Sequence, residues 1–309
     1  MKTYTTAQYH SDTPCVIALG CFDGVHKGHA AVIREAVRIA KETGVQSAVW
    51  TFEEPPRNFF SPGLSPRITD TAEKKRLVRR LGVDILVCIP FDLATGNLSP
   101  EAFFDMLCGK LCASHIVCGF NYSFGKGGAG NEALLRSLCE RAHVGFSCVG
   151  PVVLDGETVS STAVRTAVEA GDTEKAARLL DRPYAINTIV IDGQKLARRL
   201  GFPTVNQVFE RGILIPRRGV YVTRVHIGSR CYDGVTNVGM RPTVGGTLLC
   251  AETHILGFSG NLYGKRVRVD FLHFLRPETA FSSVEKLADQ VRQDIETAKI
   301  FLKQNKSGK

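Results

Sequence analysis

The chain has 309 residues, of which 44% are hydrophobic and 22% are charged, and its formal net charge is +9. This apolar fraction excludes a disordered chain, and the length is sufficient for two packed domains. No apolar run reaches the roughly 20 residues of a membrane-spanning helix, and the polar start does not resemble a secretory signal. We therefore expect a cytoplasmic protein with no membrane partner.

The ten cysteines show no C-x-x-C pair, and most of them stand in apolar runs. Structural zinc sites usually contain closely paired ligands, and disulfide frameworks belong to short secreted chains. The sequence therefore predicts reduced, mostly buried thiols and no structural zinc.

The positive charge is unevenly distributed along the chain. Residues 1–182 hold 20 basic and 20 acidic side chains, whereas residues 183–309 hold 19 and 10. A basic excess first suggests nucleic acid. Here it indicates two units with different electrostatics, and we place their boundary near Asp181-Arg182-Pro183.

The first part of the chain alternates short apolar runs with helical periodicity, which is typical of a doubly wound parallel sheet covered on both faces. The predicted strands are 15–19, 47–52, 85–89, 115–118 and 146–153. The predicted helices are 29–41, 71–81, one that begins at Pro100 with Ser99 as its N-cap, 131–142, 162–170 and 173–180.

The second part is rich in strands, with glycine-rich turns between them. The predicted strands are 185–192, 219–227, 231–238, 251–258 and 265–275, and one helix follows at 283–302. This pattern predicts an all-β barrel or sandwich with a C-terminal helix. We therefore divide the chain into domains 1–182 and 183–309.

The segment GCFDGVHKGH, Gly20–His29, follows the first predicted strand and opens the first predicted helix. Ligands bind at the carboxyl ends of parallel strands, and free amides at a helix start attract phosphate. Two imidazoles from His26 and His29 can stabilise charge during phosphoryl or nucleotidyl transfer. An isolated H-x-G-H is more often a pair of surface histidines, but its strand-turn-helix context favours a site.

Two further segments have the composition of phosphate-binding loops. GFNYSFGKGGAGN, residues 119–131, lacks the spacing and the Ser or Thr of a P-loop, so a surface loop and a ligand loop stay open alternatives. Ser161 and Thr162 start a predicted helix with Arg165 on its first turn, an arrangement suited to clamping phosphate. An ordinary N-cap beside one surface arginine is the alternative.

Together these three segments, in this order, resemble the adenylyltransferase module of bacterial bifunctional riboflavin kinase/FAD synthetases. The resemblance implies that His26 and His29 support the transition state and that Phe59 and Phe60, in EPPRNFFSP, help to receive the flavin ring. Phe59 and Phe60 are equally compatible with packing. The positions that it implies for ATP and phosphate binding are Gly20, Phe22, Asp23, Gly24, Gly28, Asn121, Ser161, Thr162 and Arg165.

In the second part, Thr204 and Asn206 alternate along an extended segment of KLARRLGFPTVNQ, so both side chains can point the same way. Their oxygens suit magnesium, with ATP phosphates completing its coordination shell. Lys195, Arg198 and Arg199 stand just upstream and could contact phosphate, although most basic runs of this kind are simply solvated turns. Glu252 lies in an otherwise uncharged strand pattern and can accept a proton from an attacking alcohol, whereas an isolated strand-end Glu is usually only exposed.

LGFPTVN, NVGMRPT, ETHIL, LYGK and LRPE, in this order, resemble the flavokinase module of the same family, whose fold is a six-stranded β-barrel with a C-terminal helix. The resemblance implies that Thr204 and Asn206 bind magnesium-ATP, that Glu252 is the base, and that Arg276 acts near the flavin phosphate. We also expect Lys195 and Arg198, the basic residues just upstream of Thr204, to contact ATP. The chain departs from the family pattern at Asn187 and Ala197, where Gly is usual, at Tyr122, where Phe is usual, and at Val205, where Ala is usual.

The resemblance spans about residues 15 to 300 and implies a two-step enzyme with riboflavin, FMN and ATP as substrates. The C-terminal domain would phosphorylate riboflavin, and the N-terminal domain would adenylylate FMN and release pyrophosphate. Two alternatives stay open. One is a related nucleotidyltransferase with another acceptor, such as phosphopantetheine or nicotinate mononucleotide, which the β-rich half argues against. The other is a flavin- or nucleic-acid-binding regulator without turnover, and of these nucleic acid is the weakest hypothesis.

Overall fold

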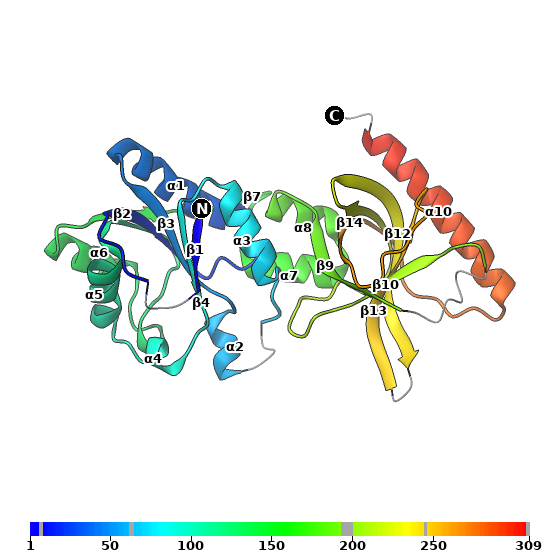
Figure 1. Ribbon diagram of the computed structural model, residues 1–309, viewed down its shortest axis with the longest axis horizontal. Coiled ribbons are helices and arrows are strands. Elements are labelled where there is room, and N and C mark those ends of the chain that lie inside the picture. Colours follow the sequence, from blue (N-terminus) through cyan, green and yellow to red (C-terminus); the bar gives the residue numbers. More distant parts are fainter. Residues whose placement is uncertain (6–8, 62–64, 193–199, 244–245, 307–309) are drawn as a thin grey trace. The chain divides into compact units, whose positions relative to one another are not determined.

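The structure is a computed structural model that describes residues 1–5, 9–61, 65–192, 200–243 and 246–306. It contains two compact units, residues 1–161 and residues 162–309 (Figure 1). The first unit holds a six-stranded sheet and the second a closed six-stranded barrel, so both predicted fold types are confirmed.

The sheet of the first unit is parallel throughout and has the strand order β1-β4-β3-β2-β5-β6. Its strands are β1 (Lys2–Tyr4), β2 (Cys15–Leu19), β3 (Gln46–Phe52), β4 (Ile85–Ile89), β5 (Ala113–Gly119) and β6 (Gly145–Val149). The strand β2 is buried at every position because both faces of the sheet are covered. It lies between β3 and β5, so the chain winds outward from β2 in both directions. Ligands of doubly wound sheets bind at such a switch point.

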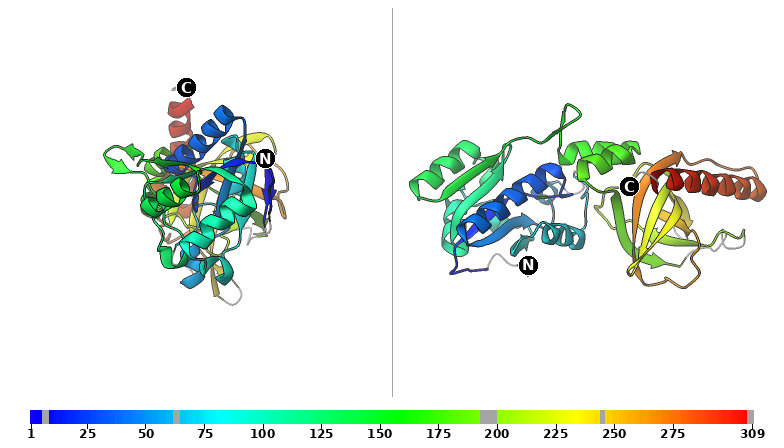
Figure 2. Two further views of the ribbon diagram at one scale, coloured as in Figure 1. Left: turned by 90° about the vertical axis from the view of Figure 1, so that its left-hand side faces the viewer. Right: turned by 90° about the horizontal axis from the view of Figure 1, so that it is seen from above.

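Helices cover the two faces of this sheet in two groups, which can be followed in Figure 2. Residues of α1 and α3 share a core with Val16 and Ala18, whereas residues of α5 and α6 share a core with Ile17 and Leu19. This alternation along β2 is the period-two consequence of a strand buried on both sides. The helices of this unit are α1 (Lys27–Thr43), α2 (Pro56–Phe60), α3 (Thr71–Arg80), α4 (Leu93–Gly96), α5 (Pro100–Leu111) and α6 (Glu132–Arg141).

The barrel of the second unit is antiparallel and closes in the order β10-β13-β12-β11-β14-β9. Its strands are β9 (Tyr184–Ile191), β10 (Thr204–Val208), β11 (Gly219–Ile227), β12 (Arg230–Thr243), β13 (Gly246–Ile255) and β14 (Arg266–Arg276). Thr223, Thr236 and Thr253 are fully buried, and their hydroxyls form a hydrogen-bonded chain with distances of 2.8 and 2.9 Å. These buried hydroxyls satisfy one another in the barrel interior.

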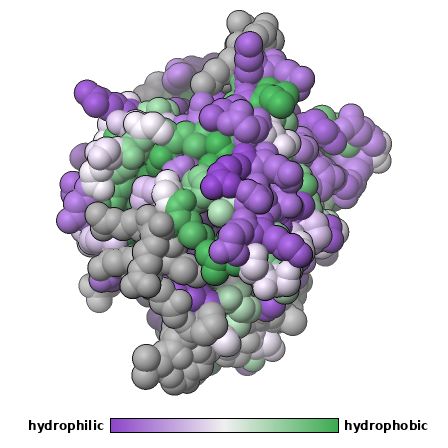
Figure 3. Space-filling view, turned by 90° about the vertical axis from the view of Figure 1, so that its right-hand side faces the viewer, coloured by the Kyte–Doolittle hydropathy of each residue, from purple (hydrophilic) through white to green (hydrophobic). Residues whose placement is uncertain are grey.

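The C-terminal helix α10 (Val284–Lys306) covers part of the outside of the barrel. Its Ile295, Ala298 and Leu302 share a core with Val222 and Val235. Figure 3 shows this side of the chain, where an apolar strip is bordered by hydrophilic side chains. On β11 and β12, Val222 and Val235 are therefore the kind of apolar residues that α10 removes from water.

Two helices join the sheet and the barrel along the chain, α7 (Ser161–Ala170) and α8 (Thr173–Leu180), after the hairpin of β7 (Val153–Leu154) and β8 (Glu157–Thr158). The Thr173 hydroxyl donates a hydrogen bond to the Leu272 carbonyl over 3.1 Å, which ties α8 to β14. The sequence prediction placed both helices in the first domain, which ended at residue 182. That functional boundary stays a prediction, while the compact units divide after Ser161, so α8 and all of α7 but its first residue belong to the unit that contains the barrel.

Candidate active sites

The segment Gly20–His26 links the carboxyl end of β2 to the start of α1 and has an unusual backbone. Phe22 and Val25 have φ values of 48° and 41°, and Gly24 between them has a φ of 81°. A branched residue such as Val25 in the left-handed region costs free energy and persists only where surrounding contacts impose it. Strain of this kind concentrates at functional sites.

Buried polar groups supply those contacts. Asp23 is 2% exposed, and its carboxylate accepts hydrogen bonds from the backbone N–H groups of Ile68 and Thr69 at 3.0 and 3.4 Å. The Cys21 carbonyl accepts from the Lys74 ammonium at 3.1 Å. Lys74 also donates to the Phe52 carbonyl at 2.6 Å, so one buried side chain fastens this segment to the end of β3.

We expect Lys74→Met to lower the free energy of unfolding by about 2 kcal/mol, because it leaves two carbonyl groups beneath the segment without their charged donor. Urea denaturation of the full chain measures the change. Lys75→Met alters the neighbouring, less buried lysine and should stay within about 0.5 kcal/mol of the unmodified chain. Equal stabilities of the two variants would contradict the anchoring role of Lys74.

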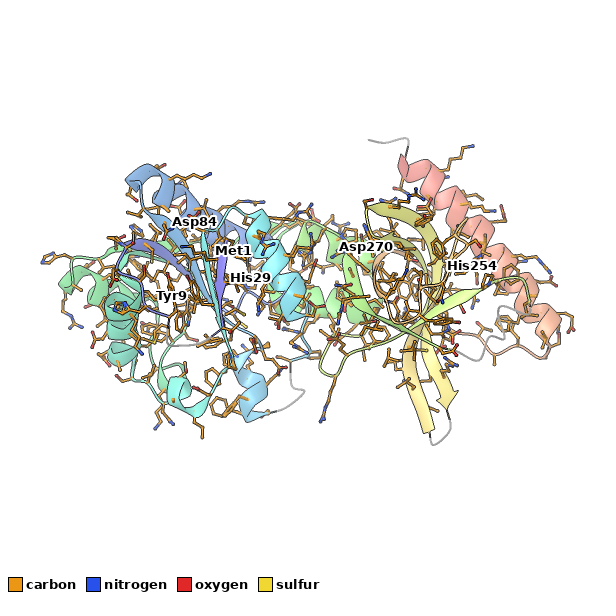
Figure 4. All side chains as sticks on the ribbon, viewed as in Figure 1. Met1, Tyr9, His29, Asp84, His254 and Asp270 are labelled. Carbon is orange, nitrogen blue, oxygen red and sulfur yellow. The ribbon has the colours of Figure 1, made fainter. Side chains whose placement is uncertain are left out.

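The two histidines lie together at the first turn of α1. His26 is the N-cap, and its Nδ1 accepts a hydrogen bond from the His29 N–H at 3.2 Å. The two rings are stacked with centroids 3.6 Å apart, and His29 is one of the residues labelled in Figure 4. A Cβ at Gly28 would lie 3.2 Å from the His26 ring, so glycine permits this close packing. The result is a pair of imidazoles at a helix end that attracts anions.

Phe22 is another predicted residue of this segment that contacts the ring of His29. Phe22 is buried, and its ring meets the His29 ring edge-on with centroids 5.3 Å apart. A Cβ at Gly20 would lie 2.8 Å from the Phe22 ring, so Gly20 and Phe22 are packed against each other. The packing of Phe22 and the hydrogen bonds of Asp23 thus stabilise the conformation of the segment.

The predicted loop after β5 begins on the strand next to β2. Asn121 is exposed, and its Oδ1 would lie 3.7 Å from a Cβ at Gly119, the last residue of β5. That Cβ would also lie 3.7 Å from Val32 of α1. Asn121 therefore stands at the carboxyl end of the strand next to β2, and its contact with a ligand stays a prediction.

Ser161 meets the histidine segment through its hydroxyl, which donates to the Asp23 carbonyl over 3.1 Å. Thr162 is exposed and Arg165 half-buried, and both stand on the first turns of α7. The start of α7 therefore bears the predicted hydroxyl and guanidinium groups, although Thr162 and Arg165 belong to the second compact unit.

Phe59 and Phe60 of the short helix α2 form an aromatic cluster with Phe91. Phe59 and Phe60 are 44% and 66% exposed, and both meet Phe91 edge-on at 5.5 and 5.8 Å. Core aromatics are normally buried, and exposed apolar groups of this size often receive a ligand or partner. Phe91 was not a sequence candidate, because the contact joins segments far apart in the chain.

The second candidate site lies across three neighbouring strands of the barrel. Asn206 on β10 is in register with Glu252 on β13, which is in register with Asn237 on β12. Residues that face each other in register lie on one face of the sheet. Thr204, two residues from Asn206, shares this face, so the predicted alternation of Thr204 and Asn206 is present.

Two side chains with opposite charges act on Glu252. Burial raises the pKa of the Glu252 carboxyl, the Arg241 guanidinium lowers it, and the Glu278 carboxylate raises it. Arg241 Nε lies 3.9 Å from Glu252 Oε1, and Arg241 Nη1 donates to Asn206 Oδ1 at 3.2 Å. Glu252 is therefore a half-buried carboxyl under electrostatic control rather than a freely solvated one.

The Glu278 carboxylate lies directly over Gly239, in the space that a Cβ at this position would occupy. Sequence reasoning missed Asn237, Arg241 and Glu278 as site residues. These residues belong to the motifs NVGMRPT and LRPE, which the sequence analysis noted. Only the fold shows that Asn237 is in register with Glu252 and that Arg241 and Glu278 act on its carboxyl.

Arg276, predicted to act near the flavin phosphate, ends β14. Its guanidinium donates to the Asp294 carboxylate of α10 at 2.9 and 2.7 Å and lies over the Phe281 ring at 5.7 Å. In this structure Arg276 ties the barrel to α10, and its contact with flavin stays a prediction. The predicted ATP contacts Lys195 and Arg198, and the unusual Ala197, lie outside the described residues.

The donor set at β10 fits a hard divalent cation. Thr204 and Asn206 offer hydroxyl and amide oxygens, which such ions prefer. Among the described residues, no group of three or more His, Cys, Asp and Glu side chains could hold a metal ion. A cation held by these two side chains would take further ligands from ATP phosphates and water. Within the same part of the chain, no helix has both the length and the apolar character for crossing a membrane.

Comparison with known proteins agrees with this division into two sites. The FAD synthetase family model matches residues 8–163, and the riboflavin kinase family model matches residues 180–302. A bifunctional riboflavin kinase/FMN adenylyltransferase of Pseudomonas fluorescens is 38% identical over 287 residues, 92% of each chain. The protein of that name from Listeria monocytogenes is 35% identical over 303 residues, 96% of this chain and 95% of its own.

A solved structure from Streptococcus pneumoniae, described as a macrolide-efflux protein, matches with a TM-score of 0.87 and 30% identity, over 97% of this chain and 99% of that chain. The order of the two family matches agrees with the order predicted from the sequence motifs. The chain belongs to the family of bifunctional riboflavin kinase/FMN adenylyltransferases, with its FAD synthetase domain at the N-terminal side and its riboflavin kinase domain at the C-terminal side.

Proposed function

We propose that the two activities of this bifunctional enzyme, riboflavin phosphorylation and FMN adenylylation, depend on separate residue sets on the two folds. Adenylylation is assigned to residues 1–182 and phosphorylation to residues 183–309. The stacked histidines at the start of α1 carry the first assignment. The in-register row of Asn206, Glu252 and Asn237 carries the second.

In the adenylylation step, a phosphate oxygen of FMN attacks the α-phosphorus of ATP, and pyrophosphate leaves. Negative charge grows on the phosphate oxygens, and N–H groups of His26 and His29 together with the positive end of α1 stabilise it. We assign phosphate contacts to the backbone of Gly20, Gly24 and Gly28 as well, because they stand between the end of β2 and the first turn of α1. We assign further phosphate contacts to Asn121, Ser161, Thr162 and Arg165, and contacts with the flavin ring to Phe59 and Phe60.

In the phosphorylation step, the ribityl 5′-hydroxyl of riboflavin attacks the γ-phosphorus of ATP, and ADP leaves. Glu252 accepts the hydroxyl proton. Its half-buried position limits the access of water to the carboxylate. Arg241 holds Asn206 through a hydrogen bond of 3.2 Å, which fixes the amide oxygen. We assign further ATP contacts to Lys195 and Arg198 and a contact near the flavin phosphate to Arg276.

Both reactions use ATP and, as is typical of such transfers, a divalent cation. We propose Mg²⁺ as that ion, held in the barrel by Thr204 and Asn206, because the available donors are hydroxyl and amide oxygens. When bound with ATP, it neutralises phosphate charge. We also propose a cytoplasmic location, since the ten cysteines are free thiols.

The electrostatic control of Glu252 predicts a shift in the pH dependence of riboflavin phosphorylation. A general base must be ionised, so the rate rises as the pH rises through its pKa. Glu278→Gln removes a like charge that raises the pKa of Glu252. The acid limb of the pH–rate profile, where the rate of riboflavin phosphorylation rises with pH, should therefore move to lower pH. Arg241→Gln removes the charge that lowers this pKa, so its limb should move to higher pH.

The paired variants make this test independent of losses in maximum rate. Arg241 also contacts Asn206, so its replacement will reduce the rate, but the position of the acid limb reports only the ionisation. Initial rates of FMN formation over a pH series measure both limbs. Shifts of both variants in the same direction would rule out Glu252 as the group that sets the limb.

A product assay tests the proposed function as a whole. The protein is incubated with riboflavin, ATP and Mg²⁺, and the flavins are separated by chromatography. FMN should form first and FAD after it. Consumption of neither riboflavin nor ATP, despite quenching of flavin fluorescence, would instead indicate a binding protein without turnover.

A further inference from the structure

A cysteine, a histidine and an aspartate form a hydrogen-bonded series on the barrel, away from the residues assigned to phosphorylation. Cys231 Sγ lies 3.2 Å from His226 Nδ1, and His226 Nε2 lies 2.8 Å from Asp270 Oδ2. The second oxygen of Asp270 accepts from Arg268 Nε at 2.7 Å. This is the geometry of a nucleophile, a base and a group that orients the base.

The strand register of the barrel builds this series. His226 on β11 is directly in register with Cys231 on β12 and with Arg268 on β14. Asp270, labelled in Figure 4, stands two residues further along β14 and on the same face as Arg268. Val225, Val267 and Val269, which alternate with them, are buried, so the series lies on the outer face of the barrel.

The series is remote from the phosphorylation residues of the same strands. On β12, Cys231 and Asn237 are six residues apart, which is roughly 20 Å along an extended strand. Val235 lies between them under α10. Arg224, which is in register with Asp270, lies 3.9 Å from Asp233, measured from Nε to Oδ1.

Asp270 determines which nitrogen of His226 carries its proton. A carboxylate can only accept, so it favours the tautomer with the proton on Nε2. That choice leaves the lone pair on Nδ1, which faces the Cys231 thiol. When Nδ1 takes the thiol proton, the imidazolium is stabilised by the negative charge of Asp270, which is mostly buried.

We propose that Cys231 is a nucleophilic thiol, activated by His226 and Asp270, that exchanges with low-molecular-weight disulfides and is thereby a site of reversible S-thiolation. The Cys231 proton moves to His226 Nδ1, and the thiolate attacks one sulfur of the small disulfide. A new S–S bond forms to Cys231 as the original one breaks, and the other half leaves as a thiolate that takes up a proton. Cys231 is oxidised and the small disulfide is reduced.

The other cysteines provide a contrast within the same chain. All ten lie in described residues, and Cys231 is exposed whereas the other nine are buried or half-buried. Burial raises the pKa of the Cys15, Cys118 and Cys139 thiols to about 12. Thiols of that kind remain protonated and inert, so modification should be selective for Cys231.

The test uses the full chain and glutathione disulfide as the probe. Peptide mass spectrometry measures the initial rate at which Cys231 gains one glutathione at neutral pH. Because His226 Nδ1 lies within reach of the Cys231 thiol and can take its proton during attack, native Cys231 should react about tenfold faster than Cys231 in the denatured chain. An equal or slower rate in the native chain overturns the proposal.

Variants separate activation from simple exposure. His226→Gln removes the base, and Asp270→Asn removes the carboxylate that orients it, so each should slow the exchange about tenfold. His273→Gln is the matched control, because His273 is also on the outside of β14 but contacts Glu174 instead of a cysteine. It should keep the wild-type rate.

Riboflavin phosphorylation serves as the check that each variant is folded, since none of these residues belongs to the phosphorylation site. Folded His226→Gln that exchanges as fast as the wild type would overturn the proposal. If that variant does not fold, Asp270→Asn and the comparison of native with denatured wild type decide the question independently. Cys231→Ser should abolish the modified peptide.

Discussion

A variant carrying both His26→Asn and His29→Asn is expected to lose the conversion of FMN to FAD by at least about a thousandfold, while it still converts riboflavin to FMN at the wild-type rate. The loss follows because both imidazoles that stabilise charge on the reacting phosphate are gone. Asparagine is chosen at position 26 because its side-chain oxygen can replace His26 Nδ1 as the N-cap acceptor of α1. Separate assays supplied with FMN or with riboflavin, each with ATP, measure the two rates.

Two controls accompany the histidine variant. His26→Ala removes the cap as well, so it should be about 1 kcal/mol less stable than His26→Asn, and this difference separates capping from catalysis. His143→Asn changes an exposed histidine of the same unit whose φ is 55°, a conformation that asparagine tolerates. It should leave both reactions unchanged. Wild-type FAD output from the double variant would show that the histidines are not the catalytic pair.

Glu252→Gln is expected to have the complementary effect, a loss of about a hundred- to ten-thousandfold in riboflavin phosphorylation with no loss in the FMN-to-FAD reaction. Glutamine keeps the shape and the polar contacts of the side chain but cannot accept the hydroxyl proton at a useful rate. Because burial raises the pKa of Glu252, replacing its carboxylate with a neutral amide should also be tolerated by the barrel.

Glu210→Gln is the matched control for Glu252→Gln. Glu210 follows β10 in the same unit and pairs with Arg266 at 3.2 Å, outside the in-register row. It should phosphorylate riboflavin at the wild-type rate. Loss of both reactions in Glu252→Gln would indicate misfolding, and loss of neither would exclude Glu252 as the base.

Much of the fold could be predicted because local signals agree with the tertiary structure. Cys15–Leu19 and Ile85–Ile89 are strands with the predicted bounds. Strands that are buried on both faces appear in the sequence as continuous apolar runs, and the ends of such a run mark the ends of the strand. Ser99 caps α5 as predicted, and its hydroxyl accepts from the Ala102 N–H at 3.1 Å. Residues 2–4 were missed because three residues give no periodicity, and β1 exists only through its pairing with β4.

The closure of the barrel could not be predicted from local sequence patterns. Periodicity alone allowed a barrel or a sandwich, and the resemblance to flavokinases supplied the six-stranded barrel. Among the residues that the structure describes, the pairing of β9 with β10 that closes it joins Asn206 with Ile191 and Gln207 with Val190. Long-range pairing of this kind leaves little trace in the sequence of either strand.

The candidate sites divide in the same way between local and long-range information. H-x-G-H stands out because its two histidines and glycine are adjacent in the chain and start a helix. Asp23 belongs to the same motif, but its hydrogen bonds to Ile68 and Thr69 and the contact of Lys74 with Cys21 join segments far apart in the chain, so the sequence did not indicate them. Arg241 and Glu278 reach Glu252 only because strands and turns fold around it.

The most direct test of two separable sites mixes the two variants with riboflavin, ATP and Mg²⁺. The His26→Asn/His29→Asn chain alone should stop at FMN, and the Glu252→Gln chain alone should leave riboflavin unchanged. Together they should produce FAD, because FMN released by the first chain is a substrate for the second. A mixture that forms no more FAD than either variant alone would contradict the assignment of the two reactions to these two residue sets.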